Sequence, residues 1–292
     1  MSAVAIGVGA WRRRRLLLPA LVLLALAGFV VLAPVVIGPH GAMVDLRHRL
    51  AGPSLAHPLG TDALGRDLLL RLGEGGRVSL LVGMVAAIAA AGLGTAIGLV
   101  AGYCGGQVDA VLMRVTDGVI ALPLLPLLIV LAAVDLDKLG LGWLARSEAV
   151  SLYRIIALVA LVGWTTVARL VRGASFSLKA QEFVRAAHAL GARPLRIMLV
   201  HILPNLAAPI IVATSLSVGE IILLESVLSF LGLGIAPPMA SWGNMLTDAQ
   251  ETIALAPLLA LYPGLFILVT VVACNFLGDG LQEAIDPRAP RR

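Results

Sequence analysis

Two acidic residues are the best candidates for chemistry. Glu220 and Glu225 lie five positions apart within the apolar stretch 206–230. A carboxylate is costly to place in a segment that crosses a bilayer, so it usually has a function or a partner. We predict that the pair lines a polar pathway or contacts a cationic group. The alternative is structural: the groups are partnered inside a helical bundle or lie beyond the lipid, and SFLGLG after Glu225 indicates a helix end.

Patterns typical of catalysis are missing from the sequence. Neither lysine, Lys138 or Lys179, ends a Gly-rich loop or precedes Ser or Thr, so there is no Walker A phosphate loop. The five histidines show no metal-ligand spacing, and no Gly-x-Ser-x-Gly elbow occurs. The two cysteines are expected to be packing residues. We therefore expect neither an enzyme nor a chain that holds a metal or cofactor.

A basic, helix-forming segment, EFVRAAHALGARPLRIMLVHILP at 182–204, separates two long apolar stretches. Gly191 is suited to end one helix in the left-handed conformation, and Pro194 to occupy the first turn of the next. The pattern predicts a helix, a sharp bend and a second short helix, at about 191–199, on the membrane surface. Such a hairpin in an otherwise apolar chain indicates a docking device.

The elements that position these residues are predicted to be membrane-spanning helices. Of the 292 residues, 59% are apolar and 13% are charged, and the mean hydropathy is +0.97. Soluble domains carry about twice that charged fraction. Six stretches reach the roughly 20 residues that a crossing needs: 16–37, 78–102, 111–134, 154–171, 206–230 and 256–277. An all-α membrane protein with six transmembrane helices is therefore predicted, and its basic charge is attributed to the membrane surface rather than to nucleic acid.

Arginines predict the orientation. The four at 12–15 immediately precede the first span and predict a cytoplasmic N-terminus. With six crossings the C-terminus is then also cytoplasmic, and 14 of the 22 basic residues fall on that side. The segment 38–77 is an exception, because it carries five arginines. A signal peptide cleaved after Ala27 is the alternative to a retained first span, and it leaves the remaining orientation unchanged.

The predicted division of the chain follows from these spans. In order it comprises a basic cytoplasmic N-terminus (1–15), a first transmembrane helix (16–37), an extracytoplasmic segment (38–77), a five-helix domain (78–278) containing the cytoplasmic loop 173–205, and a cytoplasmic tail (279–292). Outside the membrane, Thr61 or Asp62 is expected to cap an amphipathic helix running toward Arg71. Trp242 is expected at the headgroup level or against an external partner.

The 182–204 segment resembles the EAA loop of ABC importer permeases. That loop has Glu-Ala-Ala, a Gly four residues after the second Ala, and Leu-Pro about a dozen residues later. The residues that match are Ala186, Ala187, Gly191, Leu203 and Pro204. Arg185 stands where the pattern has its glutamate, so the charge at that position is reversed.

The rest of the chain, about residues 16–288, is similar to the C-type permease subunit of dipeptide and oligopeptide importers. The blocks HPLGTDALGRD, GYCGGQVDAVLMR, ESVLSFLGLGIAPPMASWGNML, YPGLF and GDGLQEAIDPR occur in the family's order. The resemblance implies a type I ABC importer permease fold in the bacterial cytoplasmic membrane. It also implies four kinds of partner: a B-type permease subunit, two ATPase subunits that bind ATP and Mg²⁺, an extracytoplasmic binding protein and a peptide substrate.

The resemblance assigns the contact with the ATPases to the loop. The implied coupling residues are Glu182, Arg185, Ala186, Ala187, Gly191, Pro194, Leu203 and Pro204. Similar permeases serve nickel, glutathione or haem importers, so those substrates stay open. A stand-alone secondary transporter, with Glu220 and Glu225 in its pathway, and a membrane-embedded enzyme or scaffold are the more distant alternatives.

Overall fold

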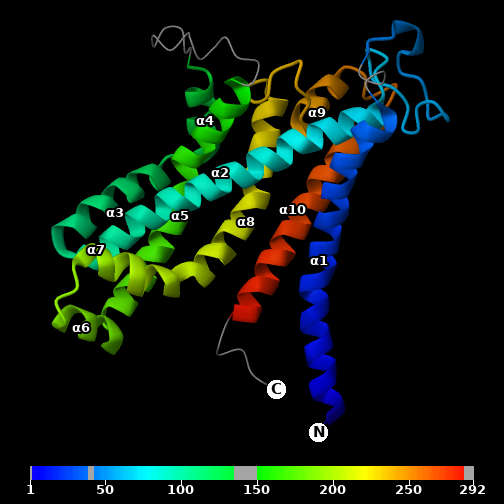
Figure 1. Ribbon diagram of the computed structural model, residues 1–292. Helices are drawn as coiled ribbons and strands as arrows, with labels where there is room; N and C mark the ends of the chain where they lie inside the picture. The colour runs from blue at the N-terminus through cyan, green and yellow to red at the C-terminus, as the bar shows by residue number, and fades with distance from the viewer. Residues whose placement is uncertain (1, 39–42, 135–149, 286–292) are drawn as a thin grey trace.

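The computed structural model describes residues 2–38, 43–134 and 150–285, with side chains from Leu16 onward, and these residues form no strand. The helices in Figure 1 are α1 (Ser2–Ile37), η2 (Leu46–His48), α2 (Leu68–Cys104), α3 (Gly106–Ala121), α4 (Leu124–Ala132), α5 (Val150–Lys179), α6 (Glu182–Ala189), α7 (Pro194–Arg196), η3 (Ile197–Ile202), α8 (Leu203–Phe230), α9 (Trp242–Gln250) and α10 (Leu258–Ile285). The predicted all-α class is confirmed.

In the described part of the chain, five or six segments can cross a membrane, a number compatible with the six that were predicted. Among the described residues, α1 from Leu16, α2, α5, the run from α7 through α8, and α10 are each long and apolar enough to cross a membrane. A sixth crossing results if α3 and α4, which are bent by 86°, together form one span. The stretch 111–134, predicted as one transmembrane helix, is thus divided into two helices. Pro123 lacks an N–H and keeps Leu122 extended, with φ −80° and ψ 135°, which breaks the helix.

The second span begins earlier than predicted. Helix α2 starts at Leu68, so the last ten residues of the segment 38–77 are helical. The cap is Asp67, whose carboxylate accepts from the Leu70 N–H at 3.0 Å, rather than Thr61 or Asp62. Two arginines at the start of α2 bond to other parts of the chain. Arg71 is buried and donates to Asp248, and the exposed Arg77 donates to the Val30 and Val31 carbonyls of α1.

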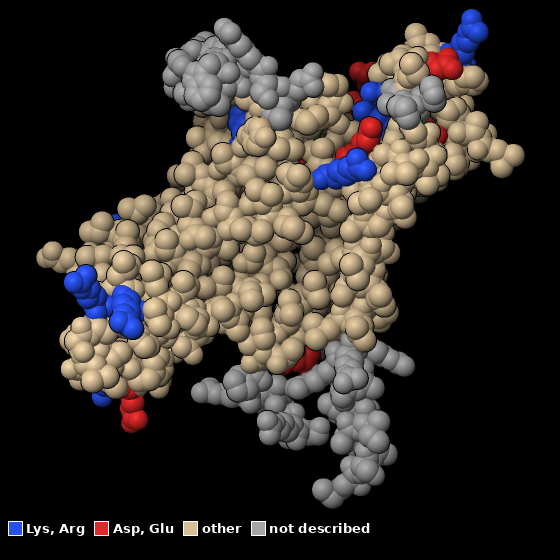
Figure 2. Space-filling view, viewed as in Figure 1, with Lys and Arg blue, Asp and Glu red and all other residues tan. Residues whose placement is uncertain are grey.

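The bundle has two ends. The start of α1, the end of α10 and the hairpin of α6 and α7 lie on one side in Figure 1, called here the α6 end. The segment 43–67, α4 and α9 lie on the other side, called here the α9 end. On the face drawn in Figure 2, charged side chains gather near these two ends and leave a broad uncharged middle, as expected for a chain that crosses lipid. The basic side chains at 12–15 and 288–292 lie outside the described residues, so the predicted orientation stays a prediction.

Helices α2 and α5 approach each other most closely along three glycines spaced by four residues. A Cβ at Gly94, Gly98 or Gly102 would lie 2.4–2.6 Å from a backbone carbonyl oxygen of α5. Small residues at this spacing let two helix backbones come into direct contact, which is how helices associate without a hydrophobic driving force in lipid. The α2–α5 pair is thus a fixed frame, and the 182–204 loop follows directly from its end.

Candidate functional site

The 182–204 loop is built around the predicted cap. Gly191 has φ +79°, the left-handed conformation that glycine adopts without a Cβ penalty. Its N–H donates to the His188 carbonyl at 3.0 Å, and the Ala192 N–H donates to the Ala187 carbonyl at 3.1 Å. These two bonds form a Schellman motif that closes α6. Pro194 is in the first turn of α7, so both local predictions are confirmed.

The expected position of the short surface helix was wrong. The free-standing short helix is α6, before Gly191, and not the segment 191–199 after it. The helix that begins at Pro194 passes through the π-helical turn η3 into α8 and reaches Phe230 as one span. Pro204 donates no backbone hydrogen bond in the first turn of α8. A π-helical turn accommodates such a defect without ending the helix.

One face of the loop packs on the bundle. Val184 and Ala187 of α6, together with Ile197 and Ile202 of η3, are buried in a cluster with side chains of α2, α5 and α8. Ala187 is therefore a packing residue, and Leu203 is half-buried against the same cluster. These contacts hold α6 at a fixed angle to α5 and α8.

The other face is exposed and carries both apolar and basic side chains. Leu190 at the tip of the hairpin is 88% exposed, which is costly for a leucine that has no partner. We call this set the outer face of the loop: Glu182, Phe183, Arg185, Ala186, Leu190, Gly191, Arg193, Pro194, Leu195 and Arg196. Of the predicted coupling residues, five lie on it, while Pro204 is exposed at the start of α8. The combination is typical of a protein-binding surface.

Ion pairs and hydrogen bonds join the base of the loop to the α2–α3 turn. Arg172 on α5 makes two hydrogen bonds of 2.5 Å to the Asp109 carboxylate on α3. Lys179 Nζ at the end of α5 donates to the Tyr103 carbonyl at 2.5 Å. The end of α5 that leads into the loop is therefore bonded to both α2 and α3.

Glu220 faces a cavity at the break between α3 and α4. The cavity has a volume of about 210 Å³, and its polar lining groups are Thr165, Thr166, Ser217 and Glu220. Leu122 and Leu124, on either side of the break, also line it. Glu220 is exposed and makes no hydrogen bond or ion pair with the described part of the chain. This geometry is compatible with the predicted pathway role, which stays a prediction.

Glu225 occupies a different environment. Its side chain is fully buried and accepts hydrogen bonds from Ser79 Oγ of α2 at 3.0 Å and from Ser229 Oγ at 2.7 Å. Nothing in the sequence linked Glu225 to Ser79, because the two residues are 146 positions apart. The structural alternative, a carboxyl group partnered inside the bundle, is thus the arrangement observed.

Trp242 was expected at the headgroup level or against an external partner, and its burial contradicts both expectations. The indole is fully buried, and its Nε1–H donates to the Leu72 carbonyl of α2 at 3.0 Å. Phe266 of α10 packs on it with ring centroids 5.5 Å apart. Trp242 therefore joins α9 to α2 and α10 and is not free to contact lipid headgroups.

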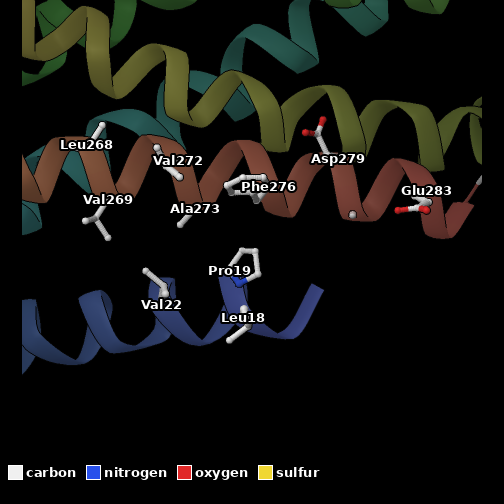
Figure 3. Close-up of a pocket in the computed structure, with 11 residues that line it drawn as sticks. Leu18, Pro19, Val22, Leu268, Val269, Val272, Ala273, Phe276, Asp279 and Glu283 are labelled. Carbon is white, nitrogen blue, oxygen red and sulfur yellow. The ribbon is translucent and has the colours of Figure 1, made fainter. Parts of the chain in front are cut away.

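A larger hollow of about 940 Å³ lies between α1 and α10. Its walls are mainly apolar, with Leu18 and Val22 facing Val272 and Phe276, and the acidic residues lie toward the C-terminal end of α10 (Figure 3). An apolar surface of this kind suits lipid chains or another helix. It is separate from the cavity at Glu220, because the two share no lining residue.

Comparisons with known proteins agree with this geometry. Residues 94–291, well over half of the chain, match the family model described as "Binding-protein-dependent transport system inner membrane component". The matched part begins inside α2 at Gly94 and includes the 182–204 loop, Glu220, Glu225 and all of α9.

Several curated relatives are about equally similar. The dipeptide transport system permease protein DppC of Bacillus subtilis is 40% identical over 97% of this chain and 86% of its own length. The DppC protein of Alkalihalophilus pseudofirmus is 40% identical over 88% of this chain and 81% of its length. The glutathione transport system permease protein GsiD of Pectobacterium atrosepticum is 40% identical over 81% of this chain and 74% of its length. The chain therefore belongs to the family of inner-membrane components of binding-protein-dependent transport systems, as the membrane-spanning permease subunit of an ABC transporter.

Proposed function

We propose that this chain is the permease subunit of an ATP-driven importer that carries dipeptides and oligopeptides across the bacterial cytoplasmic membrane. It pairs with a B-type permease subunit, and two ATPase subunits dock on its 182–204 loop and on the equivalent loop of the partner. An extracytoplasmic binding protein delivers the peptide. In this orientation the α6 end is cytoplasmic, and the α9 end faces outward.

The observation that carries the proposal is the outer face of the loop. A capped helical hairpin presents exposed leucines beside arginines, and its inner face is fixed to the core. A protein surface of this composition needs a partner with an apolar cleft and acidic groups. In an importer that partner is the ATPase. Arg185 stands where the EAA pattern has glutamate, so its positive charge calls for an acidic residue on the ATPase.

ATP and Mg²⁺ bind the partner subunits in this proposal, and this chain holds no cofactor. Closure of the ATPases displaces α6 as a rigid body, and the continuous run from Pro194 to Phe230 carries the displacement across the membrane. Because α5 is tied to the α2–α3 turn, the frame of α2 and α5 moves with the loop. A stand-alone secondary transporter would gain nothing from such a loop.

The proposal of a peptide substrate rests on the relatives, because two of them are dipeptide transport system permeases. The similarity to GsiD favours glutathione, itself a tripeptide, as the second candidate. Binding measurements with the cognate binding protein distinguish the two. A dipeptide should bind more tightly than glutathione, and the opposite order would favour the second candidate.

The loop's role is tested at Gly191. A Cβ there meets no atom within 4 Å, so substitutions act through the backbone angle of +79° and not through steric contact. Valine at this angle costs about 1–2 kcal/mol, whereas asparagine tolerates it. We expect Gly191→Val to insert and pair with the B-type subunit but to lower ATP-driven peptide uptake by roughly tenfold or more.

The matched control is Gly191→Asn, which keeps the cap and should transport normally. Uptake is measured with a labelled dipeptide in proteoliposomes that hold the assembled importer, and binding of the ATPases is measured in parallel. Normal uptake by the valine variant would rule out a coupling role for this hairpin.

A further inference from the structure

Two hydrogen-bond chains end on Glu225, and each begins at a backbone N–H: one at Ile235 in the loop between α8 and α9, and one at Trp242, the first residue of α9. In the first, the Trp242 N–H donates to Ser79 Oγ at 3.2 Å, and Ser79 donates to Glu225 Oε2 at 3.0 Å. In the second, the Ile235 N–H donates to Ser229 Oγ at 3.0 Å, and Ser229 donates to Glu225 Oε1 at 2.7 Å. One carboxyl group thus holds both sides of the loop through two serine hydroxyls.

The groups in these chains are shielded from water. The side chains of Glu225, Ser79 and Ser229 are at most 1% exposed, and Ile235 and Trp242 are buried. A buried polar group that loses its partner carries a desolvation cost, so breaking either hydrogen-bond chain is unfavourable. Between the two anchored positions the loop is exposed at Ala236–Pro238.

Further contacts make the loop and α9 one unit. Asn244 donates through Nδ2 to the Met239 carbonyl at 2.8 Å and to the Ile235 carbonyl at 3.2 Å. The capping box of Ser241 and Asn244 starts α9 immediately after the loop. Gly243 packs so closely on α8 that a Cβ there would be 2.7 Å from Ser226 Cα. The loop therefore has a preformed shape.

The position of Glu225 on α8 gives this anchor a functional meaning. The same helical run starts at Pro194 in the 182–204 loop and ends at Phe230, where the anchored loop begins. A displacement of α8 at its α6 end consequently reaches the loop, because Glu225 attaches both sides of the loop to the outer part of that helix. Ser79 attaches the same carboxyl group to α2, which belongs to the rigid frame with α5.

We propose that Glu225 is the positioning residue that fixes the 231–241 loop to α8. In this proposal the loaded binding protein docks on that loop and thereby stimulates ATP hydrolysis by the ATPases. The proposal rests on the proposed function, because it needs an importer with an external binding protein. It assigns Glu225 a role in communication rather than in the peptide pathway. Binding of the loaded protein to Ala236–Pro238 would act on α8 through the two serines.

The test uses the assembled importer in nanodiscs and the isosteric variant Glu225→Gln. The amide group keeps the side-chain volume but has one acceptor oxygen in place of two. One of the two serine hydroxyls therefore loses the acceptor on which its hydrogen-bond chain ends. Hydrogen exchange at residues 231–244 should become roughly tenfold faster or more, with residues 206–222 of α8 unchanged. ATP hydrolysis without the binding protein should stay close to that of the wild type, while stimulation by the loaded binding protein is lost.

Separate serine variants give a second, position-specific readout if Glu225→Gln does not fold. Ser79→Ala should speed exchange at Trp242 and leave Ile235 protected, and Ser229→Ala should do the reverse. Ser215→Ala is the matched control on α8, because its hydroxyl donates to the Ile211 carbonyl of its own helix at 2.9 Å and lies ten residues from Glu225. Glu251→Gln, at an exposed position after α9, controls for the loss of a carboxylate.

Three outcomes would overturn the inference. They are unchanged exchange at residues 231–244 in Glu225→Gln, retained stimulation in that variant, and uniform loosening of the whole bundle, which indicates a merely structural role. The proposed function fails separately, when the wild-type importer itself shows no stimulation by a loaded binding protein. The wild-type measurement therefore separates the two failures.

Discussion

The contact of α2 with α5 along Gly94, Gly98 and Gly102, called here the glycine seam, predicts that one added methyl group lowers the stability of the fold. In Gly98→Ala the new Cβ would lie 2.4 Å from the Ala168 carbonyl oxygen and 2.9 Å from Val171 Cβ. Ordinary contacts between such atoms are about 3.5 Å, so the helices must separate by roughly 1 Å. The same displacement loosens the contacts at Gly94 and Gly102. Overpacking of this kind costs about 1–3 kcal/mol of unfolding free energy.

The matched control is Gly92→Ala on the same helix, where a Cβ meets no atom within 4 Å. Both variants gain the same helix propensity, about 1 kcal/mol for alanine over glycine, so their difference isolates the steric cost. Thermal unfolding in nanodiscs, followed by tryptophan fluorescence, should give Gly98→Ala a lower Tm than Gly92→Ala by roughly 2–4 °C per kcal/mol. Equal Tm values for the two variants would refute direct backbone contact at this seam.

Two further predictions concern carboxyl groups. Burial raises the pKa of Asp248 above its ordinary 3.8, outweighing the nearby Arg71 and Arg66. The carboxyl group therefore holds its proton more tightly in the folded chain than in the unfolded chain. Its contribution to the free energy of unfolding is fully present below pH 3.8 and is lost as the pH rises through the pKa of the folded state. Asp248→Asn should remove this contribution, seen as a flatter dependence of Tm on pH, and an unchanged slope would contradict it. Glu220→Gln should lower uptake of peptides at limiting concentration by roughly tenfold, if the carboxylate receives their ammonium group. Normal uptake in that variant, with subunit assembly intact, would exclude a pathway role.

Local features of the fold were predictable from the sequence where one or two residues decide the backbone. Gly191 and Pro194 carry conformational preferences that act within a few positions, and the structure has both the cap and the helix start. The approximate positions of the spans follow from hydropathy for a similar reason, since lipid requires each backbone to be satisfied within its own helix. The start of α2 was missed because the continuous apolar stretch begins only at Val78, whereas the helix also includes the polar turns before it, where Arg71 is buried against Asp62 and Asp248.

Contacts between distant segments were not predictable in the same way. Glu225 was recognised as unusual, yet its serine partner on α2 has no sequence spacing that points to it. The burial of Trp242 likewise depends on where α9 packs against α2 and α10. Two local signals were present and were not used. The spacing of four between Gly94, Gly98 and Gly102 is typical of close helix pairs, and Pro123 inside an apolar run predicts a break.

The break between α3 and α4 has a consequence for how the subunit sits beside its neighbours. It lies after the 16 residues of α3, roughly 24 Å along that helix at 1.5 Å per residue. Irregular backbone within the hydrocarbon layer is stable only when protein or water covers it, and never when it faces acyl chains. We therefore expect the side of the bundle that carries the break to face another protein subunit or water and not acyl chains. This requirement restricts which side of the subunit can turn toward its partner.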